Sequence, residues 1–402
     1  MATVTKRGDT YKITVSCGYD INGKQIRRHT TWKPASGITK KQIEKELDRQ
    51  TVLFEEKVTS GEFLQDGNIK LGDFCNQYLE ILSTSESVAP TTVAMHKRAI
   101  QHYILPALGH IKMKDLKPIH VQKFIQEISK ELPNTSTRNR DQPTMKLKPA
   151  TIKRYYVVLQ SILSRACKLG VISTNPATSS KIDLPQQGQA EIEIFTKEEA
   201  SKMLSCLNNE PLIYQALIHL AIVTGARKGE LIALTWDNID LKTGTIIIKQ
   251  SNYKLTGEEI KTKTTKSGKI RSVSIPPYCV SLLKDYRVHQ MQEQIKAGDQ
   301  WNDENWVFTQ WNGKPMHVNT PSHWFSKFLA KYDLPHRKFH ALRHTSATLL
   351  LANGTNIKTV SSRLGHSQLS TTNIYLHSIE EADRAASQSF ETILQIPNQK
   401  QA

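Results

Sequence analysis

Residues 339–375 constrain the fold of this chain more tightly than any other stretch of its sequence. Apolar residues recur there at helical spacing, for example Leu342, Leu350 and Val360, and the pattern is interrupted at Asn353-Gly354. Helical periodicity broken by an Asn-Gly pair predicts two helices joined by a turn. We expect this arrangement to bring four side chains towards one pocket: His340, Arg343, His366 and Tyr375.

Three short motifs follow one another in this stretch; alone, His-x-x-Arg would usually be a surface feature and Tyr375 a buried core tyrosine. They are His-x-x-Arg at 340–343, Leu-Gly-His at 364–366, and Tyr375 nine positions after His366 (375 minus 366). Together they resemble the C-terminal active-site signature of the tyrosine recombinase, or phage integrase, family. The resemblance implies that Tyr375 attacks a scissile DNA phosphate and forms a covalent 3′-phosphotyrosine, while Arg343 binds the phosphate. It also implies that His340 accepts the proton of the phenol and that His366 binds the phosphate or positions Tyr375.

His344 follows Arg343 directly and is expected to point elsewhere on the helix as a structural residue. Further upstream, residues 224–231 resemble the first arginine motif of the same family. Arg227 and Glu230 are three positions apart, so on a helix they would share a face and the carboxylate could orient the guanidinium. Alone, such a pair would be a surface ion pair of little value to stability. The resemblance implies that Arg227 is a second phosphate-binding residue.

Two β-like runs at 245–249 and 272–275 enclose a lysine-rich segment that reads as an exposed basic hairpin. It resembles the hairpin of the same family in which a catalytic lysine lies five positions before an arginine, here Arg271 (271 minus 266). The resemblance implies that Lys266 is the general acid for the departing 5′-oxygen. Lys263 and Lys269 remain open alternatives, because spacing separates neighbouring lysines poorly.

The charge balance narrows the choice of partner. Lys and Arg number 54 against 37 Asp and Glu, a formal net charge of +17, which points to nucleic acid or an anionic membrane surface. The longest apolar run, residues 216–223, is far shorter than the ~20 residues of a membrane span, and no secretory signal is visible. The five scattered cysteines favour reduced thiols. We therefore expect a cytoplasmic DNA-binding protein, with neither a cofactor nor a metal, because no phosphate-loop motif or tight acidic cluster is present.

Residues 1–60 are predicted to form a small sheet followed by a helix. Alternating apolar residues flank Asn22-Gly23, a strong hairpin signal, and Thr39 with Gln42 can cap the helix. The cations Lys24, Arg27 and Arg28 would let the hairpin read DNA in the major groove; a solvated basic hairpin is the alternative. By architecture the segment resembles the arm-binding domain of integrases of conjugative transposons and temperate phages.

Residues 69–180 are predicted to be a helical domain with breaks at several prolines, Pro106 among them. It resembles the core-binding domain of the family, and its polar faces carry cations suited to phosphates. The candidates are Lys97, Arg98, Lys153 and Arg154. Residues 181–193 are predicted to be a linker. Residues 194–402 would form the catalytic domain, with an amphipathic tail helix at 378–395.

The predicted fold is thus multidomain and mostly α, with small β-sheets. It comprises a sheet-plus-helix arm-binding domain, a helical core-binding domain and a mixed α+β catalytic domain. The predicted function is that of a mobile-element recombinase on double-stranded DNA with core and arm sites. We expect a homotetramer coupled through the tail, with packing of the tail on its own domain as the rival, and accessory excision and host DNA-bending proteins as possible partners. The alternatives are a type IB topoisomerase-like DNA-relaxing enzyme and a catalytically silent DNA-binding architectural protein.

Overall fold

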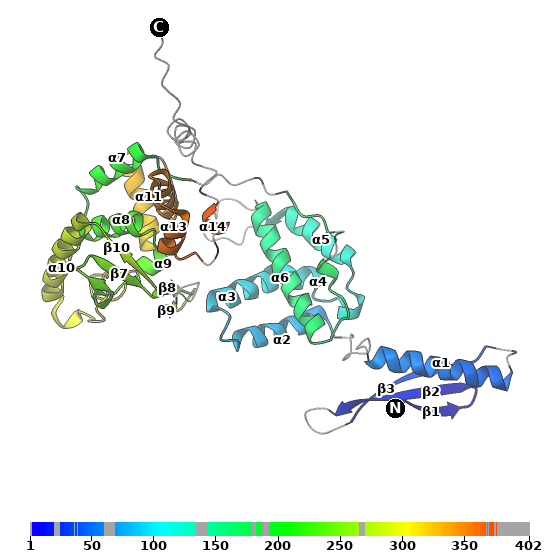
Figure 1. Ribbon diagram of the computed structural model, residues 1–402. Helices are drawn as coiled ribbons and strands as arrows, with labels where there is room; N and C mark the ends of the chain where they lie inside the picture. Colours follow the sequence, from blue (N-terminus) through cyan, green and yellow to red (C-terminus); the bar gives the residue numbers. More distant parts are fainter. Residues whose placement is uncertain are drawn as a thin grey trace, which may run out of the picture. The chain divides into compact units, whose positions relative to one another are not determined.

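The computed structural model divides into two compact units, Met1–Gln189 and Ala190–Ala402 (Figure 1). It describes residues 2–19, 25–35, 37, 39–59, 69–133, 144–178, 180, 182–186, 188, 193–264, 270–366, 368, 370–373 and 375. In this part of the chain no helix combines the length and apolar character needed to cross a membrane. The mostly helical, multidomain architecture with small antiparallel sheets confirms the predicted fold class.

The chain begins with a three-stranded antiparallel sheet in the order β1-β2-β3, built from β1 (Ala2–Arg7), β2 (Thr10–Tyr19) and β3 (Gln25–Trp32). The predicted pairing of β2 with β3 is confirmed, whereas β1 was not expected. Helix α1 (Lys40–Thr59) packs on this sheet (Figure 1), and Phe54 joins Ile13 and Val15 in a small core. The Thr39 backbone N–H donates to Gln42 Oε1 at 2.9 Å, which is the predicted cap.

The second part of the N-terminal unit is helical. Its elements are α2 (Leu71–Ser83), α3 (Pro90–Ala99), the π-helical turn η1 (Ile100–Ile104), α4 (Leu105–Leu108), the 3-10 turn η2 (Met113–Asp115), α5 (Pro118–Ser129), the strands β4 (Glu131–Pro133) and β5 (Thr144–Lys146), α6 (Pro149–Lys168) and the 3-10 turn η3 (Pro176–Thr178). Phe74, Phe124 and Leu159 are fully buried in one core. The short β4–β5 hairpin was not predicted.

The expected break at Pro106 is wrong. Helix α3 continues through η1 into α4, so Pro106 lies within the helical run rather than between helices. Proline has no N–H to donate to the carbonyl one turn back. The π-helical turn that precedes Pro106 absorbs the resulting irregularity without ending the helix.

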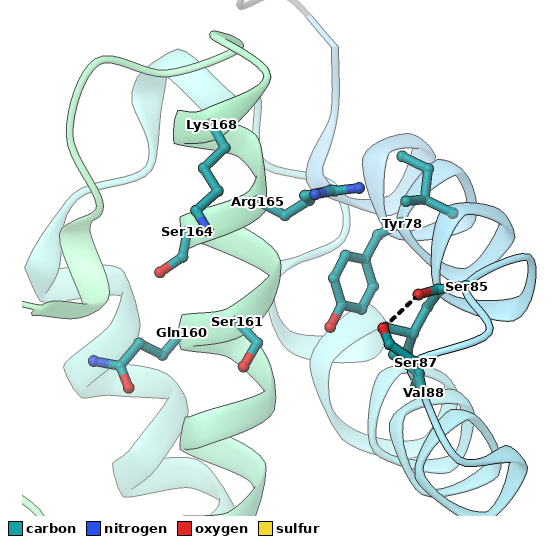
Figure 2. A pocket seen from close by; sticks show the side chains of 11 residues that line it. Tyr78, Ser85, Ser87, Val88, Gln160, Ser161, Ser164, Arg165 and Lys168 are labelled. Atoms are coloured by element: carbon teal, nitrogen blue, oxygen red, sulfur yellow. Dashed lines mark hydrogen bonds between the residues drawn. The ribbon is translucent and has the colours of Figure 1, made fainter.

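A cavity of about 460 Å³ lies in this helical domain, between the end of α2, the loop after it and α6. Figure 2 shows Tyr78 reaching in from α2 and Arg165 and Lys168 from α6, with Ser85 hydrogen-bonded to Ser87. The lining includes none of the residues that the sequence analysis selected as site residues.

The C-terminal unit combines helices with two small antiparallel sheets, β10-β7-β6 and β8-β9. Its helices are α7 (Lys197–Leu207), α8 (Leu212–Thr224), α9 (Lys228–Leu231), α10 (Pro277–Ala297), α11 (Thr320–Lys331), α12 (Ala341–Ala352), α13 (Ile357–Leu364) and α14 (Ser370–Asn373), with 3-10 turns η4 (Trp236–Asn238) and η5 (Gly298–Gln300). Its strands are β6 (Ile239–Asp240), β7 (Thr245–Ile248), β8 (Gln250–Lys254), β9 (Ile260–Thr264) and β10 (Arg271–Ser274).

Helix α8 lies at the centre of this unit, and α10 and α12 both pack against it. It is apolar on nearly all sides, with Leu217, Ile218 and Leu220 buried, as expected of a helix enclosed by others. The two predicted β-like runs pair as β7 and β10. The turn at Asn353-Gly354 separates α12 from α13, as the apolar spacing predicts.

Gly225 ends α8 in the left-handed conformation, with a φ of 60°. A Cβ at this position would collide with Leu364 Cδ2 and lie 3.2 Å from Ser346 Oγ. Glycine therefore serves two purposes here: it tolerates the positive φ, and it lets α8 approach α12 and α13 closely.

We expect Gly225→Ala to lower the free energy of unfolding of the C-terminal unit by about 2–5 kcal/mol, since backbone strain and overpacking add. Gly257→Ala is the matched control, because Gly257 also has a positive φ of 79° but nothing within 4 Å of an added Cβ. The control should cost only the strain, about 1–2 kcal/mol. Equal losses in chemical denaturation of the two variants would contradict the role of close packing.

Candidate active site

Glu230 is the buried carboxylate at the base of the site, and only 1% of its side chain is exposed. Its Oε1 accepts from Arg227 Nη1 at 2.8 Å and its Oε2 accepts from Arg271 Nη2 at 2.6 Å. Burial raises the pKa of this carboxyl, but the hydrogen bond and charge of Arg271, with the hydrogen bonds from Arg227, hold the pKa below its usual value. Glu230 is therefore ionised and binds two guanidinium groups.

The predicted contact between Arg227 and Glu230 is present, but a helix face does not create it. Arg227 precedes α9 in an extended conformation, and Glu230 is the third residue of that helix. The carboxylate reaches back to both the backbone N–H and the side chain of Arg227. This is the half of a capping box in which the third residue accepts from the backbone N–H that precedes the helix, and it fixes the direction of the Arg227 side chain.

Arg271 is a site residue to which the sequence analysis gave no role beyond marking the lysine motif. It begins β10, is 8% exposed, and donates from Nε to the Arg363 carbonyl at 2.9 Å. Its Nη1 is buried without a hydrogen-bond partner among the described residues. Gly365, with a φ of 69°, leaves room for this guanidinium, because a Cβ there would lie 2.8 Å from Arg271 Nη1. The sequence signal that could have identified Arg271 as a site residue was its place five positions after the candidate lysine, Lys266.

Arg343 projects from the first turn of α12 and is 3% exposed. Its Nη1 donates to the Gly225 carbonyl at 2.7 Å, and in the described part of the chain its buried Nη2 has no hydrogen-bond partner. Burial, followed by the charge of Arg227, lowers the pKa of Arg343 to about 10. The guanidinium remains charged at neutral pH, with one donor available for an anion.

Tyr375 is 1% exposed, and its hydroxyl lies 2.9 Å from His344 Nδ1. The expectation that His344 points elsewhere is therefore wrong: it contacts the tyrosine. Burial raises the pKa of Tyr375, while the charges of Arg343 and Arg227 act in the opposite direction. Both arginines thus lie close enough to the phenol to affect its ionisation.

The two histidines of the predicted motifs lie on either side of this group. His366 Nδ1 lies 2.7 Å from Thr372 Oγ1, and its ring is nearly parallel to that of Tyr375 at 6.3 Å between centroids. His340 precedes α12, and its ring meets His344 edge-on at 4.8 Å. Desolvation, together with neighbouring positive charge, lowers the pKa of both His340 and His366 to about 4. Both imidazoles are neutral at pH 7.

The structure therefore brings most of the predicted site residues into one cluster, and it adds Arg271 and His344. The predicted members present are Arg227, Glu230, His340, Arg343, His366 and Tyr375. Lys266 and its competitor Lys269 lie outside the described residues, as does the tail at 378–395. Lys263 lies on β9, with its amine 4.9 Å from the centre of the Tyr253 ring.

The predicted DNA-binding cations are distributed over the N-terminal unit. Lys97 and Arg98 are exposed on α3, and Lys153 and Arg154 are exposed on α6. Burial raises the pKa of Tyr155 to about 12, and the charges of Arg98 and Arg154 both oppose that rise, so both guanidinium groups lie near one phenol. Arg27 is exposed on β3, while Lys24 and the side chain of Arg28 lie outside the described residues.

Both units of this chain match known protein families. Residues 193–382 match the phage integrase family, and residues 70–129 match the phage integrase N-terminal SAM-like domain. A tyrosine recombinase XerC-like protein of Caldanaerobacter subterraneus subsp. tengcongensis is 32% identical over 390 residues, which cover 92% of each chain. Among solved structures, the Tn1549 transposon integrase in complex with a circular intermediate DNA aligns with a TM-score of 0.62 at 19% identity, covering 76% of this chain and 94% of that one.

A lambda integrase tetramer bound to a Holliday junction aligns with a TM-score of 0.55 at 16% identity, covering 92% of this chain and 94% of that one. The structural likenesses establish the fold, and the XerC-like relative extends the likeness through nearly the whole sequence. This chain belongs to the phage integrase family of tyrosine recombinases and is an enzyme of site-specific DNA recombination.

Proposed function

We propose that Tyr375 is the nucleophile that cuts and rejoins DNA through a 3′-phosphotyrosine. The observation that carries this proposal is the position of its hydroxyl, which is hydrogen-bonded to His344 and lies within the electrostatic reach of Arg343 and Arg227. A phenol has an ordinary pKa of about 10 and needs a proton acceptor or nearby cations to react at neutral pH. Tyr375 has both.

Arg343 and Arg227 bind the non-bridging oxygens of the scissile phosphate in this proposal. Arg343 offers a buried Nη2 without a partner among the described residues, and a guanidinium matches two phosphate oxygens at once. His366, whose ring lies nearly parallel to that of Tyr375, supplies a further hydrogen bond. Donors fixed in place before the reaction stabilise the charge that develops on the phosphate. Glu230 and Arg271 act as positioning residues, since they hold Arg227 in place.

His344 is the proton acceptor that the geometry supports best, ahead of His340. Burial, followed by the charge of Arg343, lowers the pKa of His344, so the ring is neutral at pH 7. Acceptance at Nδ1 requires the ring proton on Nε2. His340 then serves as a phosphate contact beside it.

The oxygen of Tyr375 bonds to phosphorus as the bond from phosphorus to the 5′-oxygen breaks. Lys266, by its resemblance to the family's hairpin lysine, gives a proton to that departing oxygen. The phosphodiester is exchanged rather than hydrolysed, so a 5′-hydroxyl from a second strand can reverse the step without an added energy source. Strand exchange of this kind is what separates recombination from DNA relaxation, and the recombinase and integrase relatives favour it.

The N-terminal unit provides DNA binding in this proposal, with residues 69–180 on the core site and residues 1–60 on the arm site. Arg98 and Arg154, exposed on α3 and α6 and both near Tyr155, support a phosphate-binding face there. The lambda integrase structure is a tetramer on a Holliday junction, and we propose the same assembly here, with residues 378–395 reaching a neighbouring copy. Residues 181–193 are the linker in this scheme. In this proposal the protein acts in the cytoplasm, together with accessory excision proteins and host DNA-bending proteins.

We expect Tyr375→Phe to abolish covalent capture of a nicked suicide duplex carrying the element's own ends, because no oxygen remains to attack phosphorus. The measurement is a denaturant-resistant protein–DNA adduct on a gel. Tyr332→Phe, in the same unit, should still form the adduct. Adduct formation by Tyr375→Phe would refute the assignment of the nucleophile.

Glu230→Gln should impair both positioning and stability. Removing one partner of a buried ionic group typically costs about 3–5 kcal/mol, so the melting transition of the C-terminal unit should fall and adduct formation should slow. The pKa of Glu230 is depressed in the fold, so its contribution is present above the unfolded value of 4.5 and is lost as the pH falls through the folded value. The difference between wild type and variant should therefore shrink below about pH 4.5.

Glu293→Gln is the control for this substitution. Glu293 pairs with Lys296 on α10, but both side chains are largely exposed, and exposed pairs contribute little. If Glu293→Gln lowered the melting transition as much as Glu230→Gln does, burial of the Glu230 carboxylate would not explain the loss of stability.

The assignment of His344 predicts a particular pH dependence. Because the pKa of His344 lies below the usual 6.5, the rate of adduct formation should stay level as the pH falls from 8 to 6.5 and decline only at lower pH. His344→Gln, which keeps a hydrogen-bond acceptor but not a base, should be about 100-fold slower and lack that acidic decline. His289→Gln, an exposed residue of α10, is the control. A wild-type rate and profile in His344→Gln would mean that His344 only fills space.

A further inference from the structure

A second cavity, of about 410 Å³, lies beside the catalytic cluster. Its walls come from Lys228 at the start of α9, Ser322 and Ser326 on α11, and the segment that leads into α12. That segment contributes His336, Arg337, Lys338 and His340, and no lining residue is acidic. His340 belongs both to this cavity and to the group around Tyr375.

Lys228 is the most informative residue of this lining. Its amine donates to Ser322 Oγ at 3.1 Å, and within the described ranges it has no ion-pair partner. The nearest carboxylate in sequence, Glu230, is already bound to Arg227 and Arg271. Burial lowers the pKa of Lys228, because an ammonium group loses solvation there without a counter-ion. A half-buried cation in a cavity without acids favours an anionic ligand.

The position of Lys228 in the chain relates this ligand to the catalytic phosphate. Arg227 and Lys228 are consecutive, yet Arg227 is held towards the catalytic cluster by Glu230, while Lys228 lines the cavity. Successive phosphates of one DNA strand are separated by only about 3.4 Å along the helix axis. Phosphates adjacent to the scissile one therefore follow at short intervals, and Lys228, consecutive with Arg227, is the cavity cation best placed to meet one.

The cavity also has the donors that a phosphate requires. An ammonium group supplies a point charge, serine hydroxyls can donate to phosphate oxygens, and Arg337 and Lys338 add positive charge at the rim. Burial lowers the pKa of His317, and the charges of Lys254 and Lys228 lower it further, so both amines lie near that ring. Several cations grouped around one cavity suit the closely spaced phosphates of one strand.

We propose that this cavity is a second phosphate site, which holds a backbone phosphate adjacent to the scissile one on the cleaved strand. Lys228 is its principal cation, and Ser322 positions the amine. The inference rests on the proposed function, since the strand must lie at Tyr375. Two phosphates held at a fixed separation determine which phosphodiester reaches the nucleophile, so this site would fix the register of the DNA strand.

The test uses the full chain and a set of nicked suicide duplexes, each with one neutral methylphosphonate at a different position flanking the scissile phosphate. In the wild-type protein one position should slow adduct formation about tenfold, the effect of losing one charge-assisted hydrogen bond. Lys228→Gln should be slower by a similar factor on unmodified DNA and should lose all further sensitivity at that position. Ser322→Ala should show a smaller change at the same position.

Lys284→Gln is the matched control, because Lys284 is exposed on α10 and outside the cavity lining. It should keep the full wild-type profile. Melting curves establish that each variant is folded. Independent, multiplicative effects of Lys228→Gln and the methylphosphonate at every position would overturn the proposal, because contacting groups must couple. Recovery of the Lys228→Gln rate on a substrate with a sulfur leaving atom would also overturn it, by identifying Lys228 as a proton donor instead.

Failure of this inference is distinguishable from failure of the proposed function. If Tyr375 is not the nucleophile, Tyr375→Phe still forms the adduct on unmodified DNA. If only the second phosphate site is wrong, Tyr375 remains essential and Lys228→Gln retains the wild-type methylphosphonate profile.

Discussion

The active site depends on one buried carboxylate that binds two guanidinium groups. Glu230 connects Arg227, at the start of α9, to Arg271, at the start of β10. Burying charges is costly unless each finds partners, and the two arginines hold the pKa of Glu230 below its usual value in spite of its burial. With Arg343 nearby, the cluster has more positive than negative charge. The buried Arg343 Nη2, which has no partner among the described residues, is a donor fixed in advance of any anion.

Two glycines allow the backbone to approach these side chains. Gly225 offers its carbonyl to Arg343 and leaves room for Leu364, so α8, α12 and α13 meet at one point. Gly365 ends α13 in the left-handed conformation and lies against the Arg271 guanidinium. The two arginines proposed to bind the phosphate, Arg227 and Arg343, therefore lie at helix starts rather than along helix faces. Helix ends and tight turns leave backbone N–H and C=O groups unpaired. These groups can bind polar side chains, so a polar site can form inside an otherwise apolar domain.

The proposed function assigns the chemistry and the recognition of DNA to different units of the chain. Cations on the N-terminal unit, such as Arg98 and Arg154, are exposed, as suits contacts that confer affinity and orientation through phosphates. Arg271 and Arg343 of the C-terminal unit are instead buried and held by fixed partners. Lys228 is intermediate, since it is half-buried and bonded to a serine rather than to a carboxylate. This gradation follows the demand on each contact, from loose tracking of the backbone to a fixed geometry at the reacting phosphate.

The sequence alone determined the features that depend on neighbours along the chain. Helical periodicity predicted α12 and α13 and the turn between them, short-range capping predicted the start of α1, and alternation predicted the pairing of β2 with β3. Motif order also predicted that residues from separate segments would share one site. Each of these signals is encoded within a few positions, so each can be read without a fold.

Only the tertiary structure decided which side chains meet across segments. His344 leaves α12 next to Arg343, and its contact with Tyr375 exists because residues 370–375 return to that side of the helix. Arg271 gained its role from Glu230, 41 positions away. Pro106 lies within a helix because a π-helical turn precedes it, and β1 and β4 are strands because partners lie beside them. Contacts between distant segments depend on how helices and strands pack, and no local pattern in the sequence contains that information.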